Sequence, residues 1–232
     1  MGEMGRAYDG SYAEYVLLPN EQIYPVDSQL SWAELAAIPE TYYTAFGSFK
    51  NMQIKEGDSI LVRAATSGVG LAFLKLVKAQ FPQNRVVGAV RSLAKKDLLQ
   101  QQGFDEIILD ERGVLQTEEK FDKILELVGP ATLKNSFDHI QSAGIICNTG
   151  QLGGKWYVEE FDPIVEVKNN SFLTSFYSGN VSQQLFDELF SYIDVYQINV
   201  SPQRIFSLEQ ILAAHSYIES QAGFGKVVVL ND

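Results

Sequence analysis

The sequence predicts an α/β fold with a Rossmann-type doubly wound parallel sheet. A strand–turn–helix unit spans residues 59–78, and after it short apolar runs alternate repeatedly with helical segments. Such alternation implies right-handed crossovers and a parallel sheet with helices on both faces. Hydrophobic residues form 46% of the 232 residues, which is enough for a substantial core in one large domain, or in one domain with a remnant of another.

The unit at residues 59–78 carries the most informative motif of the chain. Its apolar run at residues 60–62 predicts a strand, and the helical spacing of the apolar residues after Gly70 predicts a helix. Small residues at 64–70 form the turn between the two. Such a turn lets the backbone approach a pyrophosphate, while the helix N-terminus presents free N–H groups and the positive end of its dipole.

The turn matches the dinucleotide-binding pattern G-x-G-x-x-G only in part. Ala65 and Ser67 stand at the first two glycine positions, and Gly70 occupies the third. The Ser67 hydroxyl could donate to a phosphate, and Gly70 would let the helix pack closely on the sheet. A plain packing turn explains the same residues, so the motif alone leaves both interpretations open. The candidate phosphate-binding residues are Thr66, Ser67, Gly68, Val69 and Gly70.

Two strands and two helices are predicted before this unit. Alternating residues at 12–17 predict a strand, and residues 22–26 predict a second, shorter one. Neither strand has a local partner, so we expect other chains to cover them or the polypeptide to be a shortened form of a longer one. The helices are expected at residues 32–38, with Ser31 as N-cap and Glu34 completing a capping box, and at residues 41–49.

The segments after residue 80 continue the alternation of strands and helices. Residues 151–170 are less regular, and the chain is expected to be extended through Pro202. The expected strands lie at residues 85–90, 106–109, 123–128, 144–147, 171–176 and 226–230, and the expected helices at residues 93–102, 132–140, 181–195 and 208–221.

The end of the second strand of the central sheet indicates which nucleotide fits. An Asp or Glu there binds the ribose 2′-hydroxyl of NAD, whereas a basic residue receives the 2′-phosphate of NADP. This strand ends in Val90, and Arg91, Ser92 and Lys95 follow it. Arg91 offers a planar fork, Ser92 a hydroxyl and Lys95 a mobile charge. Together with the small-residue turn, this strand end predicts NADP(H) binding.

Two alternatives compete with this interpretation. Arg91 and the following lysines could simply be the solvated start of a helix, although cations there oppose the helix dipole. A methyltransferase also uses a glycine-rich first turn, but it places an acidic residue at the end of the second strand, where this chain has Val90 and Arg91.

Composition excludes several classes of partner. The net charge of -11 argues against nucleic acid or an anionic membrane as a general partner. Cys147 is the only cysteine, so no intramolecular disulfide forms, and His139 and His215 lie outside any metal-ligand spacing. No apolar run is long enough to span a bilayer, and the first residues lack the apolar core of a signal peptide. We expect a soluble cytoplasmic protein without a metal.

Residues 9–16, 36–45, 65–70 and 225–229 carry a resemblance that runs in order along nearly the whole chain. They resemble the medium-chain dehydrogenase/reductase superfamily, most closely its zinc-independent quinone oxidoreductase branch. The resemblance implies a Rossmann domain inserted into a GroES-like catalytic domain, with most of the N-terminal GroES-like region lacking a counterpart here. The implied domains are a GroES-like remnant at residues 1–45, a Rossmann NADP-binding domain at residues 46–200 and a return to the catalytic domain at residues 201–232.

The resemblance also implies where the remaining site residues lie. Thr41 would lie near the nicotinamide with Tyr43 or Thr44 as possible neighbours, and Lys226 would lie close to the cofactor, although helix packing and a solvated strand start explain the same residues. Zinc-dependent relatives carry a cysteine ligand near this helix, whereas residues 36–44 contain neither cysteine nor histidine, so no metal is expected. From their places after apolar strands, Gly129, Thr149 and Gly150 are further candidates for lining the cofactor groove.

The sequence thus predicts an NADPH-dependent oxidoreductase that reduces a quinone or a small conjugated carbonyl. An enoyl-thioester reductase is the alternative within the same class, and a catalytically inactive NADPH-binding fragment is the alternative from another class. The last strand of the sheet, at residues 171–176, is expected to pair across a two-fold axis in a homodimer, as in the family.

Overall fold

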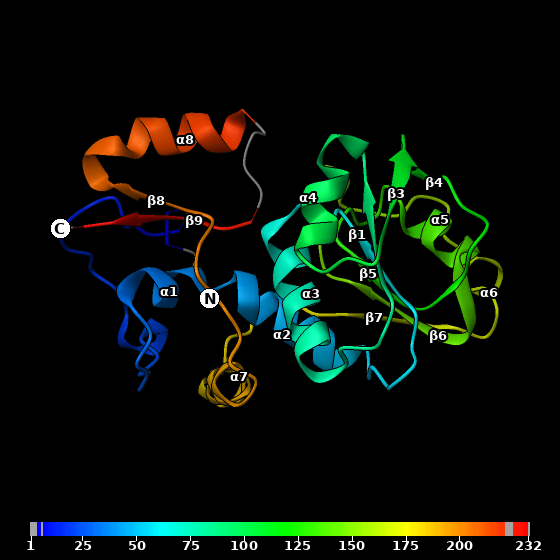
Figure 1. Ribbon diagram of the computed structural model, residues 1–232, viewed down its shortest axis with the longest axis horizontal. Coiled ribbons are helices and arrows are strands. Elements are labelled where there is room, and N and C mark those ends of the chain that lie inside the picture. The colour runs from blue at the N-terminus through cyan, green and yellow to red at the C-terminus, as the bar shows by residue number, and fades with distance from the viewer. Residues whose placement is uncertain (1–3, 6, 221–224, 232) are drawn as a thin grey trace. The chain divides into compact units, whose positions relative to one another are not determined.

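The computed structural model describes residues 4–5, 7–220 and 225–231 and divides the chain into two compact units (Figure 1). Unit 1 combines Met1–Tyr43 with Ser178–Asp232, and unit 2 is Thr44–Tyr177. The predicted boundary at residue 200 therefore differs from the end of unit 2. The assignment of the terminal segments to a GroES-like domain stays a prediction.

Unit 2 is built on a seven-stranded sheet with the strand order β4-β3-β2-β1-β5-β6-β7. All neighbours are parallel except the short hairpin of β3 and β4. This arrangement confirms the predicted Rossmann-type parallel sheet. The strands are β1 (Ile60–Arg63), β2 (Val86–Val90), β3 (Glu106–Glu111), β4 (Val114–Leu115), β5 (Phe121–Glu126), β6 (Ile140–Asn148) and β7 (Phe172–Ser175).

Helices cover both faces of this sheet. Figure 1 shows α3 and α4 on one face and α5 and α6 on the other. Leu61 of β1, Ile124 of β5 and Phe137 of α5 belong to one buried cluster on the α5 face. The helical segments are α2 (Thr41–Asn51), whose first turn belongs to unit 1, α3 (Gly68–Gln80), η2 (Leu93–Lys95), α4 (Lys96–Gln101), α5 (Leu133–Asp138) and α6 (Pro163–Glu166).

The chain order reverses between β1 and β5, which are neighbours in the sheet. In open parallel sheets a ligand binds outside the carboxyl ends of the strands at such a switch point. The carboxyl ends of β2, β1, β5 and β6 are adjacent, so the loops that follow these four strands form one edge of unit 2. This edge is where the fold positions a candidate site.

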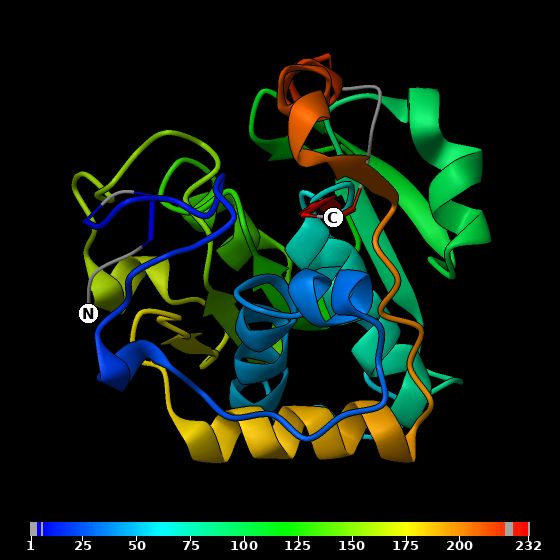
Figure 2. The same cartoon turned by 90° about the vertical axis from the view of Figure 1, so that its left-hand side faces the viewer.

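Unit 1 contains three α-helices and a two-stranded parallel sheet within its described residues. Ser31 and Glu34 form the predicted capping box at the start of the first of these helices. The segment that precedes α1 runs alongside α7 (Figure 2). Here the Gln183 side chain of α7 donates a hydrogen bond to the Pro25 carbonyl over 2.9 Å. The elements are η1 (Asn20–Gln22), α1 (Trp32–Ala37), α7 (Gln183–Val195), β8 (Arg204–Ser207), η3 (Leu208–Gln210), α8 (Ile211–Glu219) and β9 (Val227–Leu230).

The predictions for the N-terminal strands were wrong. Residues 12–17 and 22–26 form no strand, and Tyr15 and Leu17 are 88% and 94% exposed. A strand is held by hydrogen bonds to a neighbouring strand, and no strand of the described residues pairs with this segment.

Two short strands were not predicted. β8 lies between the connection expected to be extended through Pro202 and the helix expected from residue 208, and it pairs in parallel with β9, more than twenty residues later in the chain. β4 is only two residues long and pairs with β3. The predicted helix end at Gln221 lies outside the described residues.

None of the helices in the described ranges is long and apolar enough to cross a lipid bilayer.

A substitution at Gly150 tests the packing of the loops that follow β5 and β6. A Cβ atom there would lie 2.1 Å from the Leu127 carbonyl oxygen. Because this neighbour is backbone, we expect Gly150→Ala to cost about 1–3 kcal/mol and to lower the melting temperature by roughly 2–10 °C. Gly154→Ala is the matched control, because a Cβ there meets no atom within 4 Å and only its φ of +70° is strained. Thermal unfolding measures both variants, and equal decreases of their melting temperatures would contradict this account.

Candidate functional site

The turn between β1 and α3 has the geometry of a phosphate-binding turn. Ser67 is the N-cap of α3, and its Oγ accepts the N–H of Gly70 over 3.1 Å. The N–H of Leu71 goes to the Ser67 carbonyl. The N–H groups of Gly68 and Val69 in the same first turn have no acceptor within the helix, so they are the ones that can meet a ligand. The Ser67 hydroxyl proton is also free to donate, since its oxygen acts here as an acceptor.

Gly70 is required by the shape of this turn. A Cβ atom at Gly70 would lie 3.0 Å from the Ala64 carbonyl oxygen and 3.1 Å from the Ser67 Oγ. Ala64 itself has a φ of +61°, which is an uncommon value for a residue with a side chain. The turn is therefore tight, and its helix N-terminus is suited to an anion such as a pyrophosphate.

The end of β2 presents the predicted basic residues. Arg91 and Ser92 are exposed, and Lys95 is half-buried. Ser92 caps the η2 turn, because its Oγ accepts the N–H of Ala94 over 3.3 Å. Arg91 makes no hydrogen bond or ion pair within the described parts of the chain. Its guanidinium is thus available to an anionic ligand.

The loops after β5 and β6 pack directly against each other. Gly129 has a φ of +88°, and a Cβ there would lie 2.3 Å from the Gly150 carbonyl oxygen. The N–H groups of Thr149 and Gly150 both donate to the Glu126 carbonyl, over 3.0 and 3.2 Å. Close packing therefore explains both glycines, whether or not they also line a cofactor groove.

Thr149 connects its loop to α2. Its Oγ1 lies 2.9 Å from the Ser48 Oγ and 3.3 Å from the Cys147 Sγ.

Cys147 is fully buried, and burial raises the pKa of its thiol. A protonated, inaccessible thiol is a poor nucleophile, as expected for a core cysteine.

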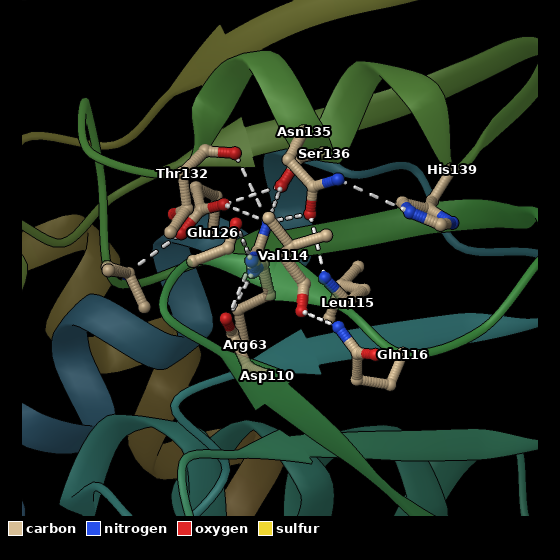
Figure 3. A network of polar contacts seen from close by, with 12 residues as sticks. Arg63, Asp110, Val114, Leu115, Gln116, Glu126, Thr132, Asn135, Ser136 and His139 are labelled. Atoms are coloured by element: carbon tan, nitrogen blue, oxygen red, sulfur yellow. Dashed lines mark hydrogen bonds and ion pairs between the residues drawn. The ribbon is translucent and has the colours of Figure 1, made fainter.

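A buried arginine that the sequence analysis did not single out lies beside this edge (Figure 3). Arg63 ends β1 and has an exposed fraction of 0%. Its Nη2 and Nε donate to Oδ2 of Asp110 over 2.7 and 3.1 Å, and its Nη1 lies 3.7 Å from Oε2 of Glu126. The remaining acceptors are the carbonyls of Gly113 and Thr132, Oδ1 of Asn135 and Oγ of Ser136. A charged residue directly after an apolar strand was the available signal, because arginine is almost never fully buried unless it is paired.

Two of the three predicted site residues of unit 1, Thr41 and Lys226, contact each other. Thr41 begins α2 and is buried, and its Oγ1 accepts from the Lys226 Nζ over 3.1 Å. Burial lowers the pKa of Lys226, and the Glu40 carboxylate opposes this effect. The Tyr43 hydroxyl donates to the Asn180 carbonyl over 3.2 Å and accepts the Ser182 N–H over 3.0 Å. The Tyr43 hydroxyl thus acts both as a donor and as an acceptor within unit 1.

The structure groups the predicted residues into two sets. One set lies at the carboxyl edge of the sheet in unit 2 and contains Thr66, Ser67, Gly68, Val69, Gly70, Arg91, Ser92, Lys95, Gly129, Thr149 and Gly150. The other set lies in unit 1 and contains Thr41, Tyr43 and Lys226. The functional roles of both sets stay predictions.

The described residues contain no group of three or more His, Cys, Asp or Glu side chains that could hold a metal ion.

Comparison with known proteins identifies the family. The sequence profile of a family described as zinc-binding dehydrogenase matches residues 102–229, more than half of the chain. The chain belongs to the zinc-binding dehydrogenase family. This match, together with similarity to quinone oxidoreductases, confirms the predicted membership of the medium-chain dehydrogenase/reductase superfamily and of its quinone oxidoreductase-like branch.

Similarity to individual members of the family is modest. The 2-methylene-furan-3-one reductase of Solanum lycopersicum is 27% identical over 225 residues, which cover 95% of this chain. The quinone oxidoreductase of Mus musculus is 28% identical over 154 residues, or 62% of this chain. The matched regions span only 52% and 46% of these two relatives.

Solved structures share the fold over nearly the whole chain. The Bacillus subtilis protein yhfP with NAD bound has a TM-score of 0.81 at 22% identity, covering 98% of this chain and 72% of that one. A mycobacterial protein complexed with NADPH has a TM-score of 0.76 at 23% identity, covering 97% of this chain and 74% of that one. The shared fold confirms the α/β architecture predicted from the sequence.

Lys226 gives unit 1 a pH-dependent contribution to stability. Because burial lowers the pKa of Lys226 in the folded protein, the unfolded chain binds more protons than the folded one between the two pKa values. The free energy of unfolding should therefore rise with pH as the solution approaches the ordinary lysine pKa. Lys226→Met removes this group, so the advantage of the wild type over the variant should grow between neutral and alkaline pH.

Urea unfolding of wild type and Lys226→Met at several pH values measures this difference. Lys168→Met is the matched control, since Lys168 is exposed and its ammonium group pairs with the Asp138 carboxylate. A constant difference between wild type and Lys226→Met across the range would contradict the prediction.

Proposed function

We propose that this chain binds NADPH and is the nucleotide-binding part of an oxidoreductase that reduces a quinone or a small conjugated carbonyl. The main support for the proposal is Arg91, whose exposed side chain follows directly after β2. An NAD-binding site would have a carboxylate at this position. Family membership and the names of the relatives support it. Two of these relatives are a quinone oxidoreductase and a reductase of a conjugated furanone.

The residues present fit such a cofactor. The first turn of α3, with the N–H groups of Gly68 and Val69 and the Ser67 hydroxyl, would hold the pyrophosphate. Arg91, Ser92 and Lys95 would hold the 2′-phosphate of the adenosine half. Gly129, Thr149 and Gly150, in the loops that follow β5 and β6, would line the rest of the cofactor. NADPH supplies a hydride when it is bound.

The chain's own contribution to the reaction would be orientation and exclusion of water. Thr41 and Lys226 offer a hydroxyl and an amine that already contact each other. A lysine whose pKa is lowered by burial can release a proton more readily than an ordinary lysine. We propose that Thr41, Tyr43 and Lys226 take part in the reaction at the nicotinamide.

The proposal includes a homodimer that forms through β7. Within the described ranges this strand pairs with β6 alone, and its Phe172 is 59% exposed. An open strand edge with apolar side chains is suited to pairing with a second copy of itself.

Turnover separates the proposed enzyme from its alternatives. We expect the purified chain to consume NADPH, followed by the loss of its absorbance, with a panel of quinones and enones. An enoyl thioester in the same panel tests the alternative reductase. Tight NADPH binding without turnover on any acceptor would favour a binding-only protein, and the absence of NADPH binding would overturn the proposal altogether.

Reversal of the cofactor preference tests the role of Arg91. Arg91→Asp removes the fork for the 2′-phosphate and supplies a carboxylate for a ribose 2′-hydroxyl. We expect the ratio of NADPH to NADH affinity to fall by at least about ten-fold, since an interaction between two charged groups is lost. Lys96→Asp is the matched control, an exposed charge reversal in the following helix outside the proposed subsite. Titration calorimetry showing an unchanged ratio for Arg91→Asp would remove this assignment.

A further inference from the structure

Arg63 connects three of the loops at the carboxyl edge of the unit 2 sheet (Figure 3). It is the last residue of β1, so the phosphate-binding turn begins at the next residue, Ala64. Its Nη2 donates to the Gly113 carbonyl in the β3–β4 turn over 3.1 Å, and its Nη1 donates to the Thr132 carbonyl over 3.1 Å. The side chain thus reaches the loops after β3 and β5 from the residue at which the loop after β1 begins.

Two buried carboxylates extend these connections. Asp110 near the end of β3 receives two bonds from the guanidinium on its Oδ2. Glu126 at the end of β5 is fully buried, and its Oε1 accepts the N–H groups of Val128 and Gly129 over 2.8 and 3.0 Å. The loop after β5 is therefore held directly by the carboxylate that lies beside Arg63.

Each of the three loops contains a residue in the left-handed region of backbone conformation. The φ angles are +61° at Ala64, +53° at Arg112 and +88° at Gly129. Such conformations persist where the surrounding structure holds them in place. Arg63 donates to the Gly113 carbonyl beside Arg112, and the Glu126 carboxylate accepts the N–H of Gly129, whereas Ala64 directly follows Arg63 in the chain.

We infer that Arg63 is a positioning residue for the cofactor: through Glu126 it sets the loop that lines the nicotinamide half, and through Asp110 and Gly113 it sets the β3–β4 turn beside the adenosine half. The inference rests on the proposed function. Lysine cannot replace arginine here, since an ammonium has no planar fork with which to reach acceptors on β3 and α5 together.

Substitutions of Glu126 and Arg63 can distinguish a role in positioning the cofactor from a role in the stability of the fold alone. NADPH contains both halves of the cofactor, whereas adenosine 2′,5′-bisphosphate contains only the adenosine half. Glu126→Gln weakens the hold on the loop after β5, so it should weaken NADPH binding by about ten-fold and leave the bisphosphate almost unchanged. Arg63→Lys should weaken the binding of both nucleotides, because it loosens both sides of the edge.

Leu61→Ala is the matched control. Leu61 is fully buried in the same strand as Arg63, and it belongs to the apolar cluster. Leu61→Ala should lower the melting temperature while both dissociation constants, measured by titration calorimetry, stay close to the wild-type values. A merely structural role of the network predicts instead that all variants lose affinity for both nucleotides in step with their loss of stability.

The outcomes separate this inference from the function on which it rests. A wild-type chain that binds neither nucleotide overturns the proposed function and the inference with it. A wild-type chain that binds both, with Glu126→Gln unchanged or weakened equally toward both, overturns the inference alone. Should Arg63→Lys fail to fold, Glu126→Gln decides the question, since this substitution removes the charge but keeps the size of the side chain.

Discussion

A full positive charge is buried inside unit 2, and the edge of the sheet is arranged to neutralise it. Arg63 has an exposed fraction of 0%, and its guanidinium is surrounded by Asp110, Glu126 and acceptors on α5. Removing one partner of a buried ion pair costs about 3–5 kcal/mol, because the other charge is left without compensation. The positions of β1, β3, β5 and α5 relative to one another are therefore tied to this one side chain.

The same edge combines polar anchoring with tight backbone packing. The loops after β5 and β6 approach so closely that Gly129 and Gly150 have no room for a side chain. The turn after β1 is also tight, because a Cβ at Gly70 would lie 3.0 Å from the Ala64 carbonyl oxygen. Loops held by close packing and buried hydrogen bonds keep their shape without a ligand, which reduces the ordering cost of binding one. A preformed edge of this kind is suited to a long cofactor that contacts several strands.

Unit 1 has a much smaller sheet than unit 2. Its sheet has two strands, β8 and β9, and α8 exposes Leu212 and Ile218. A two-stranded sheet is marginal by itself, so the unit depends on helix packing, as between Tyr43 and Phe186, whose ring centroids lie 4.7 Å apart. The chain spans about half the length of the tomato reductase and the mouse quinone oxidoreductase. In our proposal the pair of Thr41 and Lys226 is what unit 1 contributes to the reaction.

Local patterns in the sequence were sufficient for the elements whose contacts are local. The strand–turn–helix at β1 and α3, the capping box of Ser31 and Glu34, and the alternation that builds a parallel sheet all depend on residues close together in the chain. The tertiary structure decided what depends on distant partners. Residues 12–17 alternate like a strand but find no strand to pair with, and β8 exists because β9 lies beside it. Arg63 meets Asp110 and Glu126 only because β1 lies within the sheet between β3 and β5, and no spacing along the chain encodes that neighbourhood.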